Sequence, residues 1–165
     1  MVGAGGLGSS AGLYLGSAGV GKLTVVDHDV VDATNLQRQV AHTLERIGQP
    51  KALSLQTAIA AINPDVNVVP VTQRADAALL ATLVAQADVV LDCTDNFTTR
   101  HAINRACFAL GKPLVSGAAI RLDGQLSVSD PRDAASPCSA CVFPANSAVE
   151  DTRRATMRVF APRAG

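Results

Sequence analysis

Large aromatic side chains are nearly missing from this sequence, which has no tryptophan, one tyrosine and four phenylalanines among 165 residues. Its core must therefore be filled by alanine, valine and leucine, and hydrophobic residues make up 48% of the chain. Long apolar runs are missing as well. None reaches the ~18 residues that a membrane-spanning helix needs, so we expect no membrane partner. The length and the apolar content fit one packed domain.

An excess of charge of either sign is also absent, because 14 basic and 14 acidic residues balance. A surface that binds nucleic acid is usually basic, so we expect no nucleic-acid partner. Four cysteines are too few for a disulfide scaffold and favour a reducing compartment. Glycines begin at position 3 and leave no room for a signal peptide, so the expected location is cytoplasmic.

Segments typical of strands and of helices alternate along the chain. This order predicts a doubly wound, Rossmann-like α/β fold with helices on both faces of a mainly parallel sheet. Pro70 predicts an edge position for its strand, and Asp76 is expected to cap the helix that it begins. Polar and apolar residues alternate over 124–130, which predicts an antiparallel portion towards the C-terminus. The expected strands are 22–27, 66–72, 88–93, 113–119 and 124–130, and the expected helices are 7–18, 51–63, 76–87 and 98–110.

The two ends of the sequence differ from its middle. Only Met1 and Val2 precede a glycine-rich turn that normally follows a strand of about five residues. Periodicity weakens after residue 144, where several arginines occur. We expect one domain over residues 1–144, an irregular basic tail over 145–165, and truncation at both ends.

The segment Gly3-Ala4-Gly5-Gly6-Leu7-Gly8 joins that short first strand to the first helix. Glycines let the backbone approach a phosphate closely, and a helix N-terminus offers unpaired N–H groups with positive potential. Asp27, at the end of the next strand, can accept hydrogen bonds from ribose hydroxyls. The pattern predicts a nucleotide site, although a tight turn beside a surface aspartate would look similar. An NAD-dependent oxidoreductase would share it to this point.

Long polar side chains follow in "TNLQRQ", residues 34–39. Arg38, together with Lys51 at the start of the next helix, is a fixed cation suited to phosphate. Asp95 follows a later strand and offers hard oxygen ligands suited to Mg²⁺. Hydride transfer does not need two cations and a Mg²⁺ ligand around phosphates. Cleavage of a phosphoanhydride does need them. Besides the glycines and Asp27, the predicted site residues are Asn35, Arg38, Gln39, Lys51, Asp95 and Asn96.

A structural alternative for the same residues stays open. Arg38 and Lys51 could form ordinary surface ion pairs. Asp95 could instead cap the helix that begins near Thr98. The two interpretations differ in whether these side chains face one ligand cavity.

Six motifs, in this order and spacing, point to a known family. They are "GAGGLG", "VVDHDVVDATNLQRQ", "IGQPKA", "LDCTDN", "PLVSGAAI" and "PCSACVFP". Residues 1 to about 144 resemble the MoeB/ThiF (HesA/MoeB/ThiF) adenylyltransferases. That family activates ubiquitin-like sulfur carriers for molybdopterin or thiamine synthesis and is related to the ubiquitin-activating enzymes. The segment "PLVSGAAIRLDGQLSV" is more similar to the molybdopterin branch.

The resemblance implies a reaction and a role for each site residue. The C-terminal carboxylate of a MoaD- or ThiS-like carrier would attack the α-phosphorus of ATP and release pyrophosphate. A carboxylate with a pKa near ~3.5 is already ionised and needs no general base. Gly6 would approach the phosphates and Asp27 would hold the ribose. The implied catalytic residues are Arg38, Lys51 and Asp95, with Asn35 also gripping phosphate, Asp95 binding Mg²⁺ and Asn96 beside it.

Cys138 and Cys141 form a CxxC pair, which in the family is half of a structural zinc site. This sequence contains no second pair, so a bound Zn²⁺, a redox-active pair and an orphaned half-site all stay open. Cys93, expected in a core strand, and Cys107, expected in a helix, have packing roles. The resemblance also implies a homodimer.

Rival functions remain beside sulfur-carrier activation. One is a non-catalytic nucleotide-binding remnant, which the atypical ends favour. Another is an NAD-dependent oxidoreductase, which the cations and Asp95 disfavour. A third keeps the adenylation chemistry but acts on another carboxylate, such as that of a peptide or a modified tRNA base.

Overall fold

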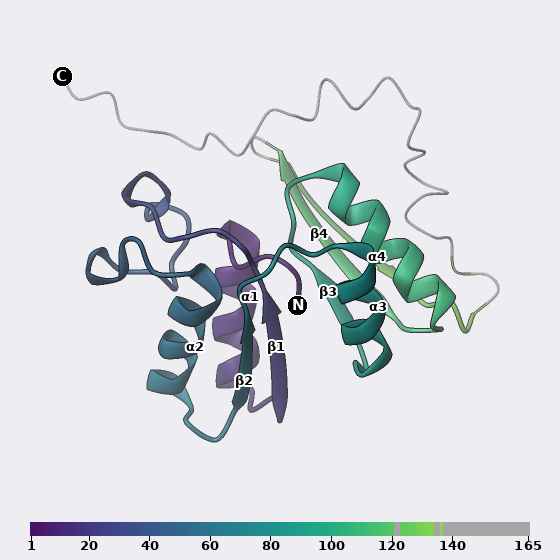
Figure 1. Ribbon diagram of the computed structural model, residues 1–165, viewed down its shortest axis with the longest axis horizontal. Coiled ribbons are helices and arrows are strands. Elements are labelled where there is room, and N and C mark those ends of the chain that lie inside the picture. The colour runs from purple at the N-terminus through teal and green to yellow at the C-terminus, as the bar shows by residue number, and fades with distance from the viewer. Residues whose placement is uncertain (121–122, 134–135, 137–165) are drawn as a thin grey trace.

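The computed structural model describes residues 1–120, 123–133 and 136, which form an α/β fold (Figure 1). Strands and helices alternate along the chain, as the sequence predicts. The elements are α1 (Gly6–Ser17), β1 (Lys22–Val26), the short 3-10 helices η1 (Ala33–Asn35) and η2 (Leu44–Arg46), α2 (Lys51–Ile62), β2 (Asn67–Val71), α3 (Ala77–Ala85), β3 (Val90–Asp92), α4 (Phe97–Ala109), β4 (Leu114–Ile120) and β5 (Asp123–Ser129).

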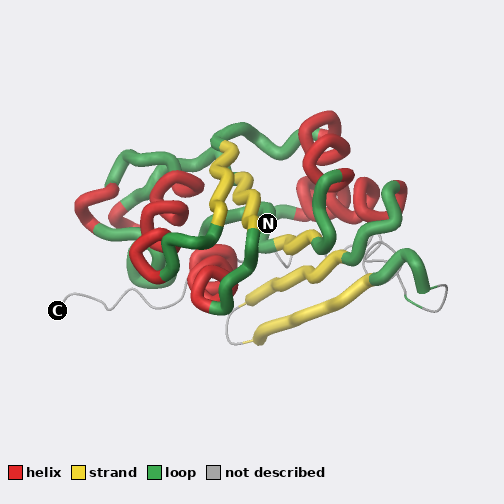
Figure 2. The backbone as a smooth tube through the Cα atoms, turned by 90° about the horizontal axis from the view of Figure 1, so that it is seen from below, coloured by secondary structure: helices red, strands yellow, loops and turns green. Residues whose placement is uncertain are grey.

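Val2 joins two groups of strands into one sheet. β1 pairs with β2 in parallel, β3 pairs with β4 in parallel, and β5 runs antiparallel to β4. Between β1 and β3, Val2 forms parallel bridges to Val26 on one side and Asp92 on the other. The spatial order is therefore β2-β1-Val2-β3-β4-β5, a mainly parallel sheet with one antiparallel strand (Figure 2). The two residues before the glycine-rich turn thus occupy the central strand position.

Most strand predictions are confirmed, and one needs correction. Pro70 lies in β2, which pairs only with β1 in the described part of the chain, so its edge position is confirmed. β5 is antiparallel, as the alternation over 124–130 predicts. β3 is shorter than expected, because only Val90–Asp92 pair with β4 and Val89 is 47% exposed. Cys93 consequently lies just beyond the strand and is only partly buried.

Helices cover both faces of the sheet, as predicted. Val25 and Val26 are adjacent in β1, and their side chains point to opposite faces. Val25 packs in a cluster with residues of α2, whereas Val26 packs in a second cluster with residues of α3 and α4. On the first face α1 lies close to α2, because a Cβ added at Gly16 would lie 2.6 Å from Ile59 Cγ2. Glycine is therefore required at that helix contact.

Local signals also fix the helix ends. Asp76 caps α3 as predicted, since its Oδ1 accepts the N–H of Leu79 at 2.8 Å.

The structure's described part contains no helix with the length and apolarity that crossing a bilayer requires.

Candidate functional site

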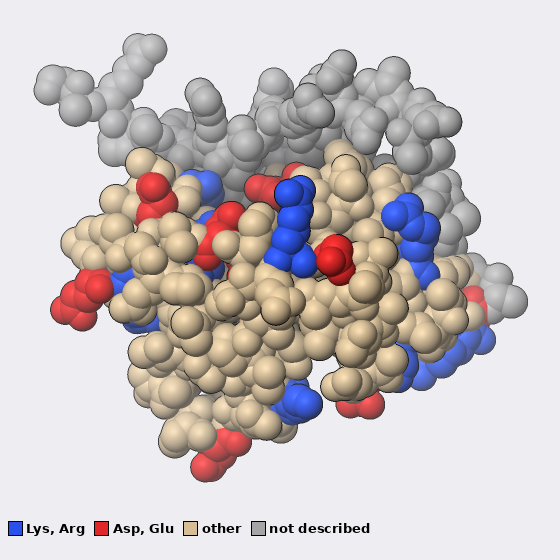
Figure 3. All heavy atoms as spheres, viewed as in Figure 1, with Lys and Arg blue, Asp and Glu red and all other residues tan. Residues whose placement is uncertain are grey.

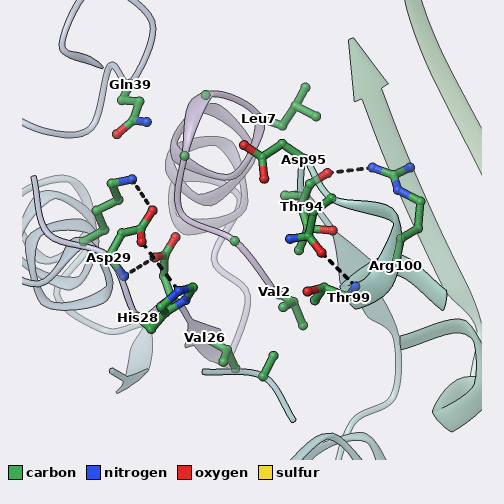
Figure 4. A pocket seen from close by; sticks show the side chains of 18 of the residues that line it. Val2, Leu7, Val26, His28, Asp29, Gln39, Thr94, Asp95, Thr99 and Arg100 are labelled. Carbon is green, nitrogen blue, oxygen red and sulfur yellow. Dashed lines mark hydrogen bonds and ion pairs between the residues drawn. The ribbon is translucent and has the colours of Figure 1, made fainter. Parts of the chain in front are cut away.

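A pocket of about 510 Å³ opens at the carboxyl ends of the parallel strands. Doubly wound folds place their ligands at this edge of the sheet. The walls come from the glycine-rich loop, the ends of β1 and β3, the η1 region, the loop after β2 and part of β4 (Figure 4). Every predicted nucleotide-site residue except Gly8 lines it: Gly3, Gly5, Gly6, Asp27, Asn35, Arg38, Gln39, Lys51, Asp95 and Asn96.

The glycine-rich loop needs glycine for close packing as well as for ligand access. Gly3 has φ +93°, and a Cβ there would lie 2.8 Å from the Cys93 carbonyl oxygen. A Cβ at Gly8 would lie 1.9 Å from the Gly3 carbonyl oxygen. Gly8 therefore lets the loop fold back on its own helix, which explains why it is absent from the pocket wall. Helix α1 begins at Gly6 without a side-chain cap, so its first N–H groups are available to an anion.

Asp27 braces the loop that it faces. Its Oδ2 accepts the N–H of Ala4 at 2.7 Å, and its Oδ1 accepts the N–H of Asp29 at 2.8 Å. Each carboxylate oxygen can accept a further hydrogen bond, so the carboxylate can still receive donors from a ligand. The sequence predicts a ligand contact here but gives no sign of the bracing role.

Two cations and an amide lie on the wall formed by η1 and the start of α2. Lys51 is 5% exposed, and its Nζ lies 3.0 Å from Oδ2 of the exposed Asp29. Arg38 donates through Nη2 to Asn35 Oδ1 at 2.8 Å. Lys51 is buried with an exposed ion-pair partner, and Arg38 is partly buried with an amide as its partner, so a structural role stays an alternative for both cations. On the face shown in Figure 3, basic and acidic side chains are interspersed.

Gln39 lines the pocket with its amide nitrogen towards the glycine-rich loop, because a Cβ added at Gly5 would lie 3.6 Å from Gln39 Nε2. The residue is 4% exposed, and its buried Oε1 has no hydrogen-bond partner among the described residues. A buried polar atom without a partner costs about 1–3 kcal/mol.

The loop between β3 and α4 forms the opposite wall. Asn96 accepts the N–H of Thr99 at 2.8 Å and caps α4. The alternative in which Asp95 caps this helix is therefore wrong, because the neighbouring amide does so. Asp95 is exposed, lines the pocket, and makes no hydrogen bond or ion pair within the described residues. Its oxygens are free to bind a hard cation.

A buried network supports that loop, and the sequence motifs did not identify it. Asp92 is fully buried, and its Oδ1 accepts the N–H and the hydroxyl of Thr94 at 3.0 and 2.6 Å. Arg100 approaches Asp92 Oδ2 at 3.4 Å and donates to the Thr94 carbonyl at 2.7 Å (Figure 4). No local sequence signal identifies this network, because Arg100 finds its partners through the tertiary fold. Arg74, after β2, is a further cation on the pocket wall that the sequence reasoning missed.

The two cysteines within the described residues, Cys93 and Cys107, give no sign of nucleophilic chemistry. Burial raises the pKa of Cys93 to about 11 and that of Cys107 to about 11, so both thiols stay protonated at neutral pH. Cys138 and Cys141 lie outside the described residues, and the zinc prediction stays a prediction. Asp27, His28 and Asp29 place ligand atoms within 4.8 Å of one another, but Asp29 already pairs with Lys51.

A sequence model described as the ThiF family matches residues 1–164. The chain belongs to the ThiF family. The predicted family resemblance is therefore confirmed.

Two curated relatives from Escherichia coli show the same relationship. The molybdopterin-synthase adenylyltransferase is 50% identical over 142 residues, which are 86% of this chain and 57% of that protein. The adenylyltransferase of the sulfur carrier protein ThiS is 44% identical over 165 residues, which are all of this chain and 65% of that protein. The chain thus spans about six tenths of the length of these relatives. Both names describe adenylyl transfer, which disfavours the oxidoreductase alternative.

A solved structure confirms the fold class. The Escherichia coli tRNA N6-threonylcarbamoyladenosine dehydratase, solved in complex with AMP, is 31% identical. The match has a TM-score of 0.70 and covers 74% of this chain and 51% of that one.

Proposed function

We propose that this chain binds ATP with Mg²⁺ and is the nucleotide-binding part of an adenylyltransferase that activates a ubiquitin-like sulfur carrier. One observation carries the proposal. One pocket is lined by the cations Arg38 and Lys51 and by the carboxylate of Asp95, which has no partner within residues 1–120, 123–133 and 136. The same pocket receives the N-terminus of α1, which has no side-chain cap. That combination suits a polyphosphate with its metal ion and has no purpose in hydride transfer.

The residues would act by positioning and by neutralising charge. The carrier's C-terminal carboxylate oxygen forms a bond to the α-phosphorus, and the bond from that phosphorus to the bridging oxygen breaks as pyrophosphate leaves. Arg38 and Lys51 would balance the charge that collects on the phosphate oxygens. Asp27 would hold the ribose. Asp95 fits Mg²⁺ because it is an exposed oxygen donor that no other described residue engages, and the bound ion would supply further neutralisation of phosphate charge.

A ubiquitin-like sulfur carrier is proposed as the substrate because the relatives that match at 44–50% identity include a ThiS adenylyltransferase and a molybdopterin-synthase adenylyltransferase. A second candidate is adenylation of a carboxylate on a modified tRNA base. The similarity to an AMP-bound tRNA threonylcarbamoyladenosine dehydratase favours it, at the lower identity of 31%. A homodimer, a cytoplasmic location and a zinc site at Cys138 and Cys141 stay predictions from the family resemblance.

Nucleotide titration and pyrophosphate exchange test the proposal. Calorimetry should give Mg²⁺-dependent binding of ATP that is tighter than binding of NAD. Labelled pyrophosphate should enter ATP only when a carrier with a free C-terminus is added, and a carrier with an amidated C-terminus is the matched control. Binding without exchange would support the non-catalytic remnant. Tighter binding of NAD, independent of Mg²⁺, would contradict the proposal.

A further inference from the structure

His42 lies behind the glycine-rich loop and is 5% exposed. Its two ring nitrogens have different partners. Nε2 lies 2.8 Å from the Ala4 carbonyl oxygen, and Nδ1 lies 2.9 Å from the hydroxyl of Ser54. Because a carbonyl oxygen only accepts, Nε2 carries the hydrogen, and Nδ1 of the neutral ring accepts from Ser54.

Arg46 sets the direction of this chain of hydrogen bonds. Its Nη1 donates to the Ser54 hydroxyl at 3.2 Å, to the Ser54 carbonyl at 2.6 Å and to the Ala41 carbonyl at 3.2 Å. A guanidinium group only donates, so the Ser54 hydroxyl accepts from Arg46. Because Nδ1 of the neutral His42 ring carries no hydrogen, the hydroxyl gives its own hydrogen to that nitrogen. The chain therefore runs one way, from Arg46 through Ser54 and His42 to Ala4.

The peptide groups on both sides of Ala4 are held as a result. Its N–H donates to Asp27, and its carbonyl accepts from His42. Ala4 is fully buried and comes directly before Gly5 and Gly6, where α1 begins without a side-chain cap. Glycine peptides without such restraint sample many orientations. The two bonds to Ala4 therefore decide where the free N–H groups of this turn point.

We propose that His42 is a positioning residue for the nucleotide, which aims the N–H groups of the glycine-rich turn at the phosphates without touching the ligand. The proposal rests on the proposed function. His42 is not among the residues that line the pocket, so its effect on the ligand must pass through Ala4.

The charges around the ring favour the neutral form that this role requires. Burial lowers the pKa of His42 most. The Ala4 carbonyl opposes that shift, the cations Lys51 and Arg46 lower the pKa further, and the carboxylate of Asp27 raises it. The ring is therefore neutral at pH 7, and Nδ1 is free to accept from Ser54.

Two replacements of His42 separate positioning from packing. In His42→Gln the side-chain amide nitrogen reaches about as far as Nε2 and can still donate to Ala4, whereas the shorter amide of His42→Asn cannot. We expect the Kd for ATP with Mg²⁺, measured by calorimetry, to stay within about threefold in the Gln variant. It should rise about tenfold in the Asn variant, which is the effect of one ordinary hydrogen bond. Ile59→Val, a buried change away from the pocket, is the control for lost stability. Equal affinity losses in the Gln and Asn variants would overturn the proposal.

Amide hydrogen exchange tests the same idea without nucleotide. Exchange of the Ala4 N–H should be faster in the Asn variant than in the parent chain and unchanged in the Gln variant. Unchanged exchange in the Asn variant would overturn the positioning role. If the parent chain binds no ATP, the proposed function fails, and the exchange result still decides the role of His42. If the Asn variant does not fold, nitrogen NMR of the parent gives the answer, because a hydrogen found on Nδ1 would contradict the geometry.

Discussion

Replacing Arg100 by leucine should destabilise the protein by about 3–5 kcal/mol, because the change leaves a buried carboxylate without its counter-ion. Asp92 is fully buried, and its Oδ2 lies 3.4 Å from Arg100 Nε. The same guanidinium donates to the Ser116 hydroxyl at 2.9 Å and to the carbonyls of Thr94 and Gly117 at 2.7 and 2.8 Å. Leucine would therefore also leave buried acceptors unpaired, each at a cost of about 1–3 kcal/mol.

Urea denaturation measures the effect. With an m value of about 2 kcal/mol per molar urea, a loss of this size lowers the midpoint by roughly 2 M without changing m. Arg105→Leu is the matched control, because Arg105 lies exposed on the same helix. We expect that change to stay within about 0.5 kcal/mol.

A double variant checks the cause. Arg100→Leu combined with Asp92→Asn should lose less stability than the two single losses added together, since neither residue then leaves a buried charge. A loss below about 1 kcal/mol in Arg100→Leu alone would refute the reasoning, because that is the value of an exposed ion pair.

Three further predictions concern two residues of the pocket and His42 behind the glycine-rich loop. Asp95→Ala should abolish carrier-dependent pyrophosphate exchange and leave the urea midpoint unchanged, because this exposed carboxylate has no partner in the described part of the chain; a normal exchange rate would exclude the metal-binding role. Arg38→Ala should slow exchange about a hundredfold, on the order of 3 kcal/mol, with a smaller rise in KM for ATP; a rate within about threefold of the parent would assign Arg38 to a structural pair with Asn35. The lowered pKa of His42 means that the unfolded chain binds a proton before the folded protein does, so stability should be complete above the unfolded pKa of about 6.5 and fall as pH drops below it. His42→Gln should lack this part of the pH dependence in urea titrations between pH 7.5 and 5.5.

β1, α3 and the glycine-rich turn show what local sequence determines. A run of β-branched residues, an aspartate cap and a glycine cluster each act within a few residues, so their positions follow from the sequence. The doubly wound fold class then follows from the alternation of strands and helices. Since strand ends meet at one edge of a parallel sheet, Asp27, Lys51 and Asp95 could be expected in one pocket, where the structure has them.

The contacts of His42 and Arg100 could not be predicted in this way. His42 reaches Ala4 across 38 positions. Arg100 joins Asp92 of β3, Thr94 of the loop after it and Ser116 of β4. Such bonds depend on tertiary packing, which local propensity does not encode. The helix cap at α4 shows a subtler limit. Asp95 and Asn96 are both good caps, and only the backbone path after β3 determines which one bonds to Thr99.

The seam at Val2 has a consequence for how the molecule unfolds. The sheet is joined there by the bridges from Val2 to Val26 and Asp92, and the buried cluster on the α3 and α4 face crosses the seam, because it holds Val2, Val26 and Val90. The pocket lies across this seam, with Asp27 on one side and Asp95 on the other. A nucleotide that contacts both would add a connection across the seam to the one that the buried cluster already makes. At a hundred times its Kd, the nucleotide would add about 2.7 kcal/mol to the free energy of unfolding. Occupancy of the pocket would therefore stabilise the strands on both sides of Val2 together.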